Sequence, residues 1–209
     1  MIEPRIYRAA FLPTLLALVL VAFSLETPPA PLPQALAADA LFAGTLAQNT
    51  IGQIVSTSPD RTPGSTGDFA IADRVKRDFI AAGFPTTLDR FTQDGRGLLN
   101  VVGTRPGQTN REIVVMAARD SRTKPDAAGS AADTAALLEF ARVFQGRASQ
   151  HTIVLASVDG STLGNAGARR FLATMGNPGQ VEAVIVISDL GARRSRGSRS
   201  RSPPAPRES

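Results

Sequence analysis

Apolar positions in the second half of the chain fall into short β-branched runs separated by longer stretches. The runs at 113–117, 151–158 and 183–187 are rich in Val and Ile and too short for helices, which predicts three buried strands. Residues 133–144 lack Gly and Pro and are apolar on most sides, which predicts a buried helix, and residues 164–175 predict another. Strands that alternate with helices are typical of an α/β domain.

Two further helices are predicted nearer the N-terminus. Residues 35–55 follow a mostly helical pattern. Asp68 suits the N-cap of a second helix, which Gly83 ends. The apolar face of this second helix is formed by Ile71, Val75, Phe79 and Ala82.

A predicted β-hairpin follows these helices. Residues 86–92 and 97–103 read as strands joined around Asp94-Gly95, a common hairpin dipeptide. A hairpin followed by alternating strands and helices indicates an α/β fold whose mixed sheet has a parallel centre flanked by helices. No helix pattern follows the strand at 183–187, so we expect the sheet to be incomplete on its C-terminal side.

An apolar segment near the N-terminus predicts attachment to a membrane. Residues 1–8 carry two Arg and form the expected cytoplasmic flank of the uncharged residues 9–25. We expect residues 9–25 to be a membrane anchor, with the rest of the chain extracytoplasmic. A cleaved signal, which would release a secreted protein, and a buried core helix are the alternatives. Residues 26–37 form a Pro-rich spacer before the domain at 38–191.

The net charge of +5 is located in the C-terminal tail. Residues 192–209 hold six of the 23 Lys and Arg and one of the 18 Asp and Glu, so 17 of each sign remain elsewhere and cancel. This Arg/Ser/Pro tail is expected to be disordered because it has no apolar surface to bury. It is interpreted as a binder of anionic surfaces, a solvated terminus, or the product of a frame change. We expect no nucleic-acid partner, because no aromatic residue is interleaved for stacking.

The composition excludes several kinds of site. The chain has no Cys, which excludes disulfides and thiolate zinc sites, and its one His excludes a site with two imidazoles from one chain. His151 begins a predicted strand and lies at the opposite end from the loop after residue 117, so we expect no ligand role for it. That loop follows the carboxyl end of a strand, where open α/β sheets place their chemistry.

Several short motifs, in order and spacing, resemble one family of enzymes. They are Arg61-Thr62-Pro63-Gly64-Ser65, Asn100-Val101-Val102-Gly103, residues 112–121, Leu137-Leu138-Glu139 and Asp159-Gly160. Over residues 38–191 the chain is similar to the co-catalytic zinc aminopeptidases, a family of leucine aminopeptidase-like and glutamate carboxypeptidase-like exopeptidases. The resemblance implies a zinc-exopeptidase-like fold and, in active relatives, zinc.

The resemblance also implies where metal ligands and the general base would lie. Ala118 replaces a His ligand, and Ala128-Gly129-Ser130 replaces an acidic pair. Ser161 and Thr162 replace the Glu base and a Glu ligand, so Asp189 is the only ligand position retained. A hydroxyl group is no base near neutral pH without its own activator, and one carboxylate cannot hold two zinc ions. We therefore predict no catalytic residue, no metal site and no cofactor.

The loops of this vestigial site are defined by Asp120, Ser121, Asp159, Ser161, Thr162 and Asp189. Asp126 and Asp133 lie near the acidic-pair position but out of register, and Asp133 also suits a helix N-cap. Arg119 is expected to be solvated or paired with an Asp. The alternative is that Arg119 binds a small polar ligand together with Asp120, Ser121 and Asp189.

The function predicted from the sequence is a membrane-tethered, zinc-peptidase-like domain without catalytic activity, which at most binds a ligand or partner. One alternative is an active zinc aminopeptidase in which the ligand positions differ from those assigned above. The second alternative is a tethered basic tail that binds anionic surfaces.

Overall fold

The structure is a computed structural model that describes Leu15 and residues 42–191. The predicted anchor at 9–25 (apart from Leu15), the spacer and the tail at 192–209 lie outside the described residues. Within the described ranges, no helix combines the length and apolar character needed to cross a membrane. The fold described below belongs to the second of two units of the chain, Ala38–Ser209.

The main elements alternate as the sequence predicts. In order they are α2 (Gly44–Thr57), α3 (Thr66–Ala81), β1 (Thr86–Gln93), β2 (Arg96–Arg105), β3 (Glu112–Ala118), η2 (Ala127–Ala131), α4 (Ala132–Phe144), β4 (Thr152–Val158), α5 (Ala166–Thr174), η3 (Pro178–Gln180) and β5 (Val181–Ile187). Each predicted strand is present and differs from the prediction by one or two residues at its ends. The first predicted helix begins, among the described residues, only at Gly44.

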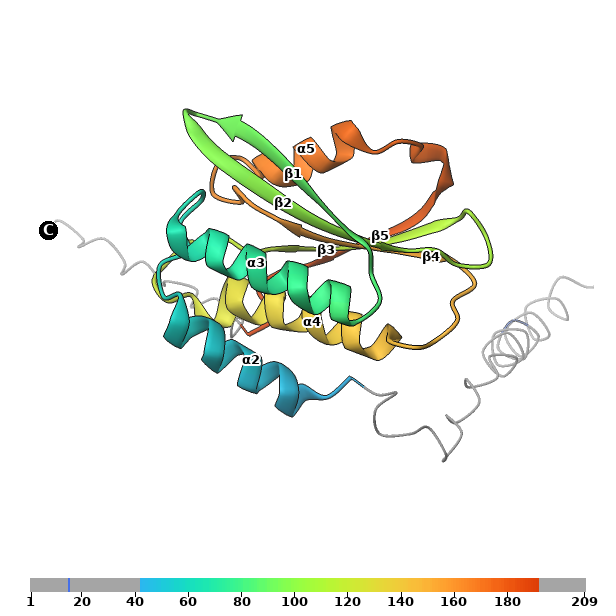
Figure 1. The fold of residues 1–209 in the computed structure, drawn as a ribbon, viewed down its shortest axis with the longest axis horizontal. Coiled ribbons are helices and arrows are strands. Elements are labelled where there is room, and N and C mark those ends of the chain that lie inside the picture. Colours follow the sequence, from blue (N-terminus) through green and yellow to red (C-terminus); the bar gives the residue numbers. More distant parts are fainter. Residues whose placement is uncertain (1–14, 16–41, 192–209) are drawn as a thin grey trace, which may run out of the picture. The chain divides into compact units, whose positions relative to one another are not determined.

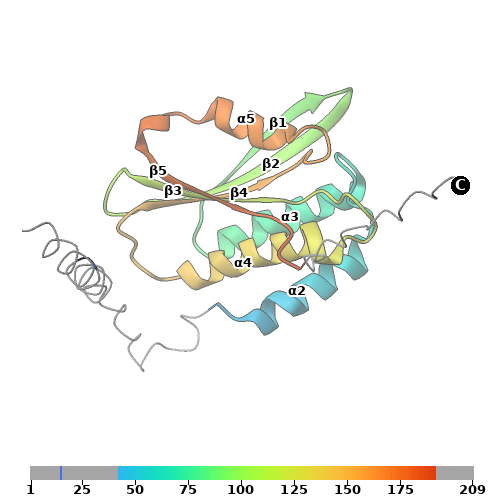
Figure 2. The same ribbon diagram turned by 180° about the vertical axis from the view of Figure 1, so that it is seen from behind.

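The five strands form one mixed sheet in the order β1-β2-β4-β3-β5. The β1–β2 and β2–β4 pairs are antiparallel, whereas β3 pairs in parallel with β4 and with β5. Helices α3 and α4 cover one face, α2 packs on α4 on the side away from the sheet, and α5 covers the other face (Figures 1 and 2). This arrangement confirms the predicted α/β fold with a mixed sheet flanked by helices.

The core follows the period of two along β3. Val115 and Ala117 face α3 and α4 and join the larger apolar cluster, while Val114 and Met116 face α5 and pack with Phe171. Successive side chains of a strand point to opposite faces, so β3 is buried on both. The parallel strands are therefore fixed in register, and the loops after β3, β4 and β5 emerge at one edge of the sheet.

Local signals set the ends of several elements. Asp94 and Gly95 both have positive φ, of 50° and 72°, which is the conformation of a two-residue type I′ hairpin turn. The prediction that Asp68 caps α3 is wrong. Ser65 is the N-cap, and its side chain accepts a hydrogen bond from the Asp68 backbone N–H at 3.1 Å. Asp68 lies in the first helical turn, and its carboxylate is free to act elsewhere.

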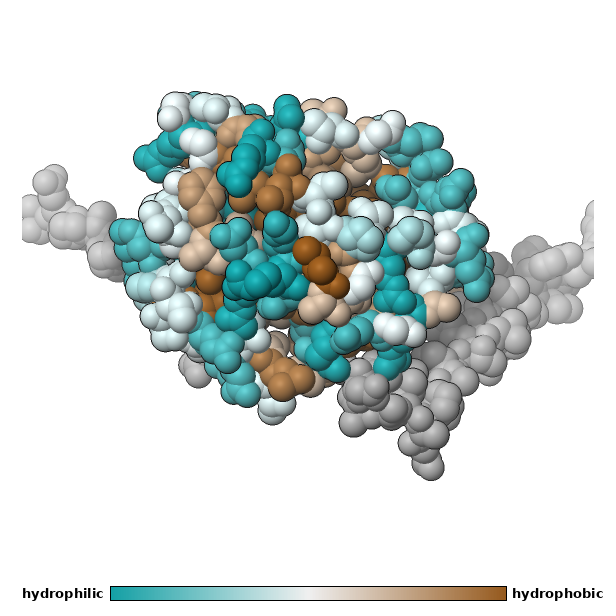
Figure 3. All heavy atoms as spheres, viewed as in Figure 1, coloured by the Kyte–Doolittle hydropathy of each residue, from teal (hydrophilic) through white to brown (hydrophobic). Residues whose placement is uncertain are grey.

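The two edges of the sheet differ. At one edge, β1 carries Asp89, which pairs with Arg170 of α5 at 3.1 Å. At the other edge, β5 pairs only with β3 among the described residues, and most of it is exposed. The face drawn in Figure 3 is mostly hydrophilic, with hydrophobic residues in separate patches.

Candidate functional site

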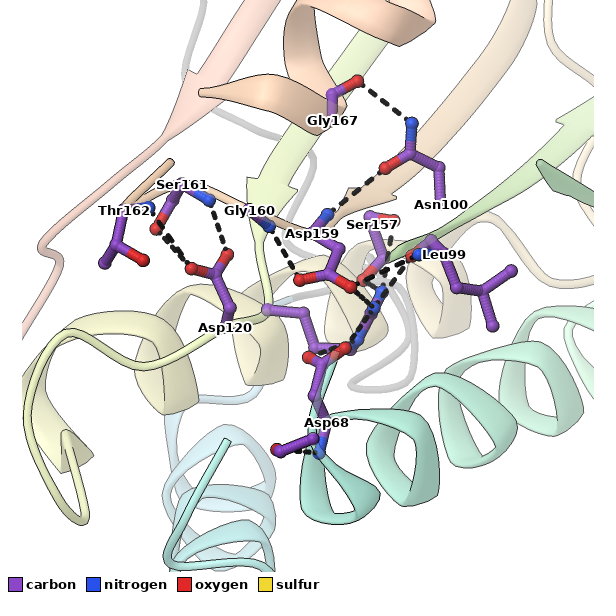
Figure 4. Close-up of polar contacts among 12 residues, drawn as sticks. Asp68, Leu99, Asn100, Asp120, Ser157, Asp159, Gly160, Ser161, Thr162 and Gly167 are labelled. Atoms are coloured by element: carbon purple, nitrogen blue, oxygen red, sulfur yellow. Dashed lines mark hydrogen bonds and ion pairs between the residues drawn. The ribbon is translucent and has the colours of Figure 1, made fainter. Parts of the chain in front are cut away.

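Three loops meet where β3, β4 and β5 end. Because β3 lies between β4 and β5 and runs parallel to both, residues 119–126, 159–165 and 188–191 leave the sheet at the same edge. This edge contains all six residues of the predicted vestigial site. Figure 4 shows part of the hydrogen-bond network that holds the first two loops together.

The Asp120 carboxylate holds the loop after β4. Its Oδ1 accepts a hydrogen bond from the Ser161 backbone N–H at 2.8 Å, and its Oδ2 accepts from the Ser161 hydroxyl at 2.8 Å and from the Thr162 N–H at 3.3 Å. Figure 4 shows Asp120 directed toward both residues. The predicted site residues Asp120, Ser161 and Thr162 are thus in direct contact. Both oxygens of the carboxylate already accept hydrogen bonds from this loop.

Arg119 points away from that contact and into the protein. It is fully buried and binds the Asp68 carboxylate with two nitrogens, Nε to Oδ1 at 2.9 Å and Nη2 to Oδ2 at 2.7 Å. Nη2 also donates to the Leu99 carbonyl at 2.8 Å. Although burial lowers the pKa of Arg119, the charge and hydrogen bonds of Asp68 raise it above its ordinary value. Arg119 is therefore paired with an Asp, as one of the predictions had it. The alternative prediction, that Arg119 and Asp189 bind a small polar ligand together, is wrong.

Asp159 is a second buried carboxyl group beside this pair. Its Oδ2 lies 3.6 Å from Arg119 Nη2 and accepts the Leu99 backbone N–H at 3.2 Å. Burial, together with the nearby Asp68 carboxylate, raises the pKa of Asp159 to about 7, against the opposing charge of Arg119. The single guanidinium does not neutralise two carboxylates, so Asp159 retains its proton at pH values well above those at which an Asp carboxyl group usually loses it.

Asn100 fixes the end of β4 against α5. Its side-chain oxygen accepts the Asp159 backbone N–H at 3.2 Å, and its side-chain nitrogen donates to the Gly167 carbonyl at 2.9 Å (Figure 4). A Cβ atom added at Gly167 would lie 2.3 Å from the Asp159 carbonyl oxygen. The close approach of α5 to the loop therefore requires glycine at this position.

The loop after β5 is held by Asp133. The carboxylate oxygens of Asp133 accept the backbone N–H groups of Asp189 at 3.0 Å and of Leu190 at 3.1 Å. Burial raises the pKa of Asp133, and these two hydrogen bonds oppose that shift. The alternative that Asp133 is a helix N-cap is wrong, because the N-cap of α4 is Ala131. The side chain of Asp189 is exposed and lies 4.0 Å from Arg122.

Arg61 is a structural residue whose contacts are not apparent in the sequence. It is fully buried, and its guanidinium donates to the carbonyls of Ser58 at 2.6 Å and Pro125 at 3.0 Å and to the Ser130 hydroxyl at 3.1 Å. Its backbone carbonyl accepts the Ser121 N–H at 2.7 Å. The sequence identified the Arg-Thr-Pro-Gly-Ser segment as a motif, but not the contacts of its Arg. Arg61 and Ser121 therefore tie the loop after β3 to the start of α3.

The side chains of residues 42–191 do not fit a zinc pair. Across residues 42–191, no three His, Asp or Glu side chains lie together in a group able to hold a metal ion. Asp126 accepts the backbone N–H groups of Arg122 at 3.2 Å and Ser130 at 3.3 Å, so it stabilises its own loop. His151 lies at the far end of the sheet, 3.6 Å from Glu182. Zinc sites use three or four protein ligands, and none of these arrangements supplies them.

A small cavity lies between the loops. It has a volume of about 90 Å³ and is bordered by Ala118, Arg122, Ser161, Asn165 and Ser188, among others. Pockets that enclose small-molecule ligands usually measure about 300–1,000 Å³. The cavity is therefore the size of a few water molecules, and it is too small for an aminoacyl group with its peptide.

Comparison with solved structures defines the class of fold. The chain aligns with Porphyromonas gingivalis glutaminyl cyclase with a TM-score of 0.64 at 20% identity, covering 73% of this chain and 61% of the cyclase. A Zn-dependent exopeptidase from Parabacteroides distasonis aligns with a TM-score of 0.64 at 18% identity, covering 73% of this chain and 63% of the exopeptidase. The zinc aminopeptidase from Bacillus subtilis aligns with a TM-score of 0.66 at 11% identity, covering 70% of this chain and 69% of the aminopeptidase. At these identities the likeness shows a shared zinc-exopeptidase-like fold alone.

The sequence profile of peptidase family M28 matches residues 100–204, about half of the chain. The chain therefore belongs to peptidase family M28, as the motifs indicated. It spans 61% of the cyclase and 63% of the exopeptidase, less than two thirds of either protein. A comparison with curated proteins gives no match.

Proposed function

We propose that this member of peptidase family M28 is a non-catalytic domain, tethered outside a membrane, that acts by binding a ligand or partner. One observation carries the proposal. Ser161 and Thr162, at the positions of the Glu base and a Glu ligand in the resembling enzymes, are held by the Asp120 carboxylate. Of the other ligand positions, Ala118 and the stretch Ala128-Gly129-Ser130 offer no carboxylate or imidazole, and only Asp189 is retained.

The chemistry of this arrangement supports the proposal. A co-catalytic site needs several anionic or imidazole ligands and one further carboxylate to activate water. Asp120 is the nearest carboxylate to Ser161, but its oxygens already accept three hydrogen bonds. Asp189 is exposed and beside Arg122, and the neighbouring Asp133 carboxylate already accepts the backbone N–H groups of Asp189 and Leu190. The carboxylates of Asp120 and Asp133 are therefore used in hydrogen bonds that hold the loops together.

Metal content and hydrolysis of purified full-length protein test the inactive state. We expect far less than one zinc per chain by elemental analysis, and no release of an aminoacyl reporter above the rate without protein. A zinc aminopeptidase assayed in parallel is the positive control. The variant Ser161→Glu should remain inactive, because it returns a base without a metal-bound water to act on. About two zinc per chain with chelator-sensitive hydrolysis would instead establish the active aminopeptidase.

The tether rests on the uncharged residues 9–25 and the two Arg before them. Carbonate extraction should leave the full-length chain in the membrane fraction, and external protease should digest the domain. A soluble chain that begins near residue 38 would instead indicate a cleaved signal and a secreted protein.

A further inference from the structure

The exposed edge strand β5 has the features of an interaction surface. Among residues 42–191 it pairs only with β3, so one row of its backbone N–H and C=O groups has no strand partner. Val184, Ile185 and Val186 are 46%, 47% and 64% exposed. Successive residues point to opposite faces of a strand. The apolar surface of β5 therefore continues over both faces of the sheet as well as along its edge.

An apolar groove adjoins the strand on the α4 side. It has a volume of about 530 Å³, and its lining includes Phe42, Phe140, Val143, Ile185 and Leu190. Phe42 and Phe140 meet edge to face, with their ring centroids 5.9 Å apart. Edge strand and groove thus form one continuous apolar surface, and contiguous surfaces of this kind mark protein–protein contacts.

The strand has few of the features that prevent edge pairing. Natural edge strands are protected by Lys, Pro, inward-pointing charges or bulges. From Ala183 to Ile187 the sequence is Ala-Val-Ile-Val-Ile, without a charge or a proline. The pairing of β3 with β5 has one irregularity, at the start of β5, where Glu182 is an extra residue between the partners of Glu112 and Ile113. Residues 183–187 therefore offer a regular template for another strand.

We propose that β5 pairs antiparallel with β5 of a second copy of this chain, about a two-fold axis at Val184. Val184 is the central residue of Val181–Ile187, and residues 183–187 form the regular part of this strand. The pairing sets Val184 against itself, Ala183 against Ile185 and Glu182 against Val186. A two-fold contact must be self-complementary, and in this register no charge faces a like charge.

The charges at the two ends of β5 favour the antiparallel direction. Glu182 pairs with Arg111 at 3.3 Å at the start of the strand, and Asp189 lies 4.0 Å from Arg122 beyond its end. Antiparallel pairing brings Glu182 toward the partner's Arg122 and Arg111 toward the partner's Asp189. Parallel pairing would align each charge with its own copy, which is unfavourable for like charges directly opposite one another.

The symmetry also brings the apolar grooves together. A two-fold axis perpendicular to the sheet keeps the α4 layers of both copies on the same side. The groove beside β5 in each copy then faces its counterpart across the new strand pair. The contact therefore combines backbone hydrogen bonds along the edge with apolar burial beside it, which is how strand addition gains its affinity.

Cysteine cross-linking of the full-length protein tests the register, because the chain has no Cys of its own. Oxidised Val184→Cys protein should form a disulfide-linked dimer of twice the chain mass, since directly opposed Cβ atoms lie about 4.5–5.5 Å apart. Leu172→Cys is the matched control, because Leu172 is 52% exposed on α5 and away from the edge. It should stay monomeric on the gel.

A mixing experiment distinguishes this contact from other associations. Glu182→Cys and Val186→Cys proteins should cross-link when mixed and much less when each is alone, because each residue lies opposite the other in the partner. Residues 182 of the two copies lie four positions apart, about 13 Å along the strand. Cross-linking by each variant alone that equals the mixture, no cross-linking by Val184→Cys, or an adduct with a different protein would each overturn the proposal.

A charged substitution tests the interface independently. Val184→Lys places two positive charges at the axis, and its mass by light scattering in detergent should fall to half that of the wild type. Leu172→Lys should keep the dimer mass, and the thermal midpoints of the two variants should match when both proteins are diluted until neither forms dimers. A wild-type protein that is monomeric at tens of micromolar, or a Val184→Lys protein that stays dimeric, contradicts the proposal. If Val184→Lys fails to fold, the cysteine pairs still decide the question.

Discussion

Arg119 is a buried cation whose removal leaves Asp68 without its ion-pair partner. Breaking a buried pair from one side typically costs about 3–5 kcal/mol, because the remaining charge stays desolvated. We expect Arg119→Met, which keeps much of the side-chain volume, to lower the free energy of unfolding by that amount in urea titrations. Arg119→Met combined with Asp68→Asn should recover part of the loss.

The matched control for that prediction is Arg122→Met. Arg122 lies three residues away but is exposed, and its contact with Asp189 is 4.0 Å long. Exposed pairs contribute about 0–1 kcal/mol, so this variant should unfold close to the wild type. Equal effects of the two substitutions would show that Arg119 is not held by a buried ion pair in solution.

Asp159 predicts a pH dependence of stability. Its pKa is about 7 in the folded protein, raised from 3.8 by burial and by Asp68. Between these values the folded state keeps a proton that the unfolded state has released, so stability falls as pH rises through this window and levels off above it. The largest slope from one group is about 1.4 kcal/mol per pH unit.

The variant Asp159→Asn isolates this contribution. It cannot lose a proton, so its stability relative to the wild type should rise between pH 5 and pH 8, as measured by urea unfolding at each pH. Asp189→Asn, which changes an exposed carboxylate, is the control and should show no such trend. A constant difference between Asp159→Asn and wild type would mean that Asp159 titrates at its ordinary pKa.

At the scale of elements, two glycines in helices should respond in opposite ways to Ala. A Cβ at Gly52, inside α2, meets nothing within 4 Å, whereas a Cβ at Gly167, in α5, would lie 2.3 Å from the Asp159 carbonyl and 2.5 Å from Asn100 Oδ1. Gly52→Ala should stabilise the protein by about 0.5–1 kcal/mol through helix propensity. Gly167→Ala should destabilise it by separating α5 from β4. Thermal midpoints measured side by side check both signs.

The elements themselves were largely predictable from sequence, for a physical reason. Runs such as Ile113–Met116 are buried on both faces of the sheet, so they are apolar at every position and distinct from their surroundings. The hairpin at Asp94-Gly95 was predictable because its turn requires positive φ. Helix starts were less certain. Ser65 and Asp68 both suit an N-cap, and tertiary contact with Arg119 decided between them.

The candidate site was predictable only in its location. The loop after β3 follows from the strand pattern, and the contact of Asp120 with Ser161 and Thr162 follows from β3 and β4 being neighbours. The pairing of Arg119 with Asp68 joins residues 51 positions apart. No local pattern encodes such a distance, and the same sequence is compatible with an exposed Arg119. The contacts of Arg61 with Pro125 and Ser130 were not predictable for the same reason.

At the scale of the whole molecule, the proposed dimer predicts how stability depends on concentration. Association stabilises the folded state by mass action. We expect the thermal midpoint of the wild type to rise with protein concentration and that of Val184→Lys to stay constant. A midpoint that does not change with concentration in the wild type would indicate that β5 contributes no association.

The unlike edges of the sheet also set a limit to growth. If β5 pairs with its copy, the only outer strands left among the described residues are the two β1 strands. Strand β1 carries Asp89 and Arg90 side by side, and Arg170 from α5 is anchored on Asp89. Charges of this kind oppose the addition of further strands. Assembly would therefore terminate at two chains. A sheet with one exposed apolar edge strand would form a closed dimer in place of a fibre.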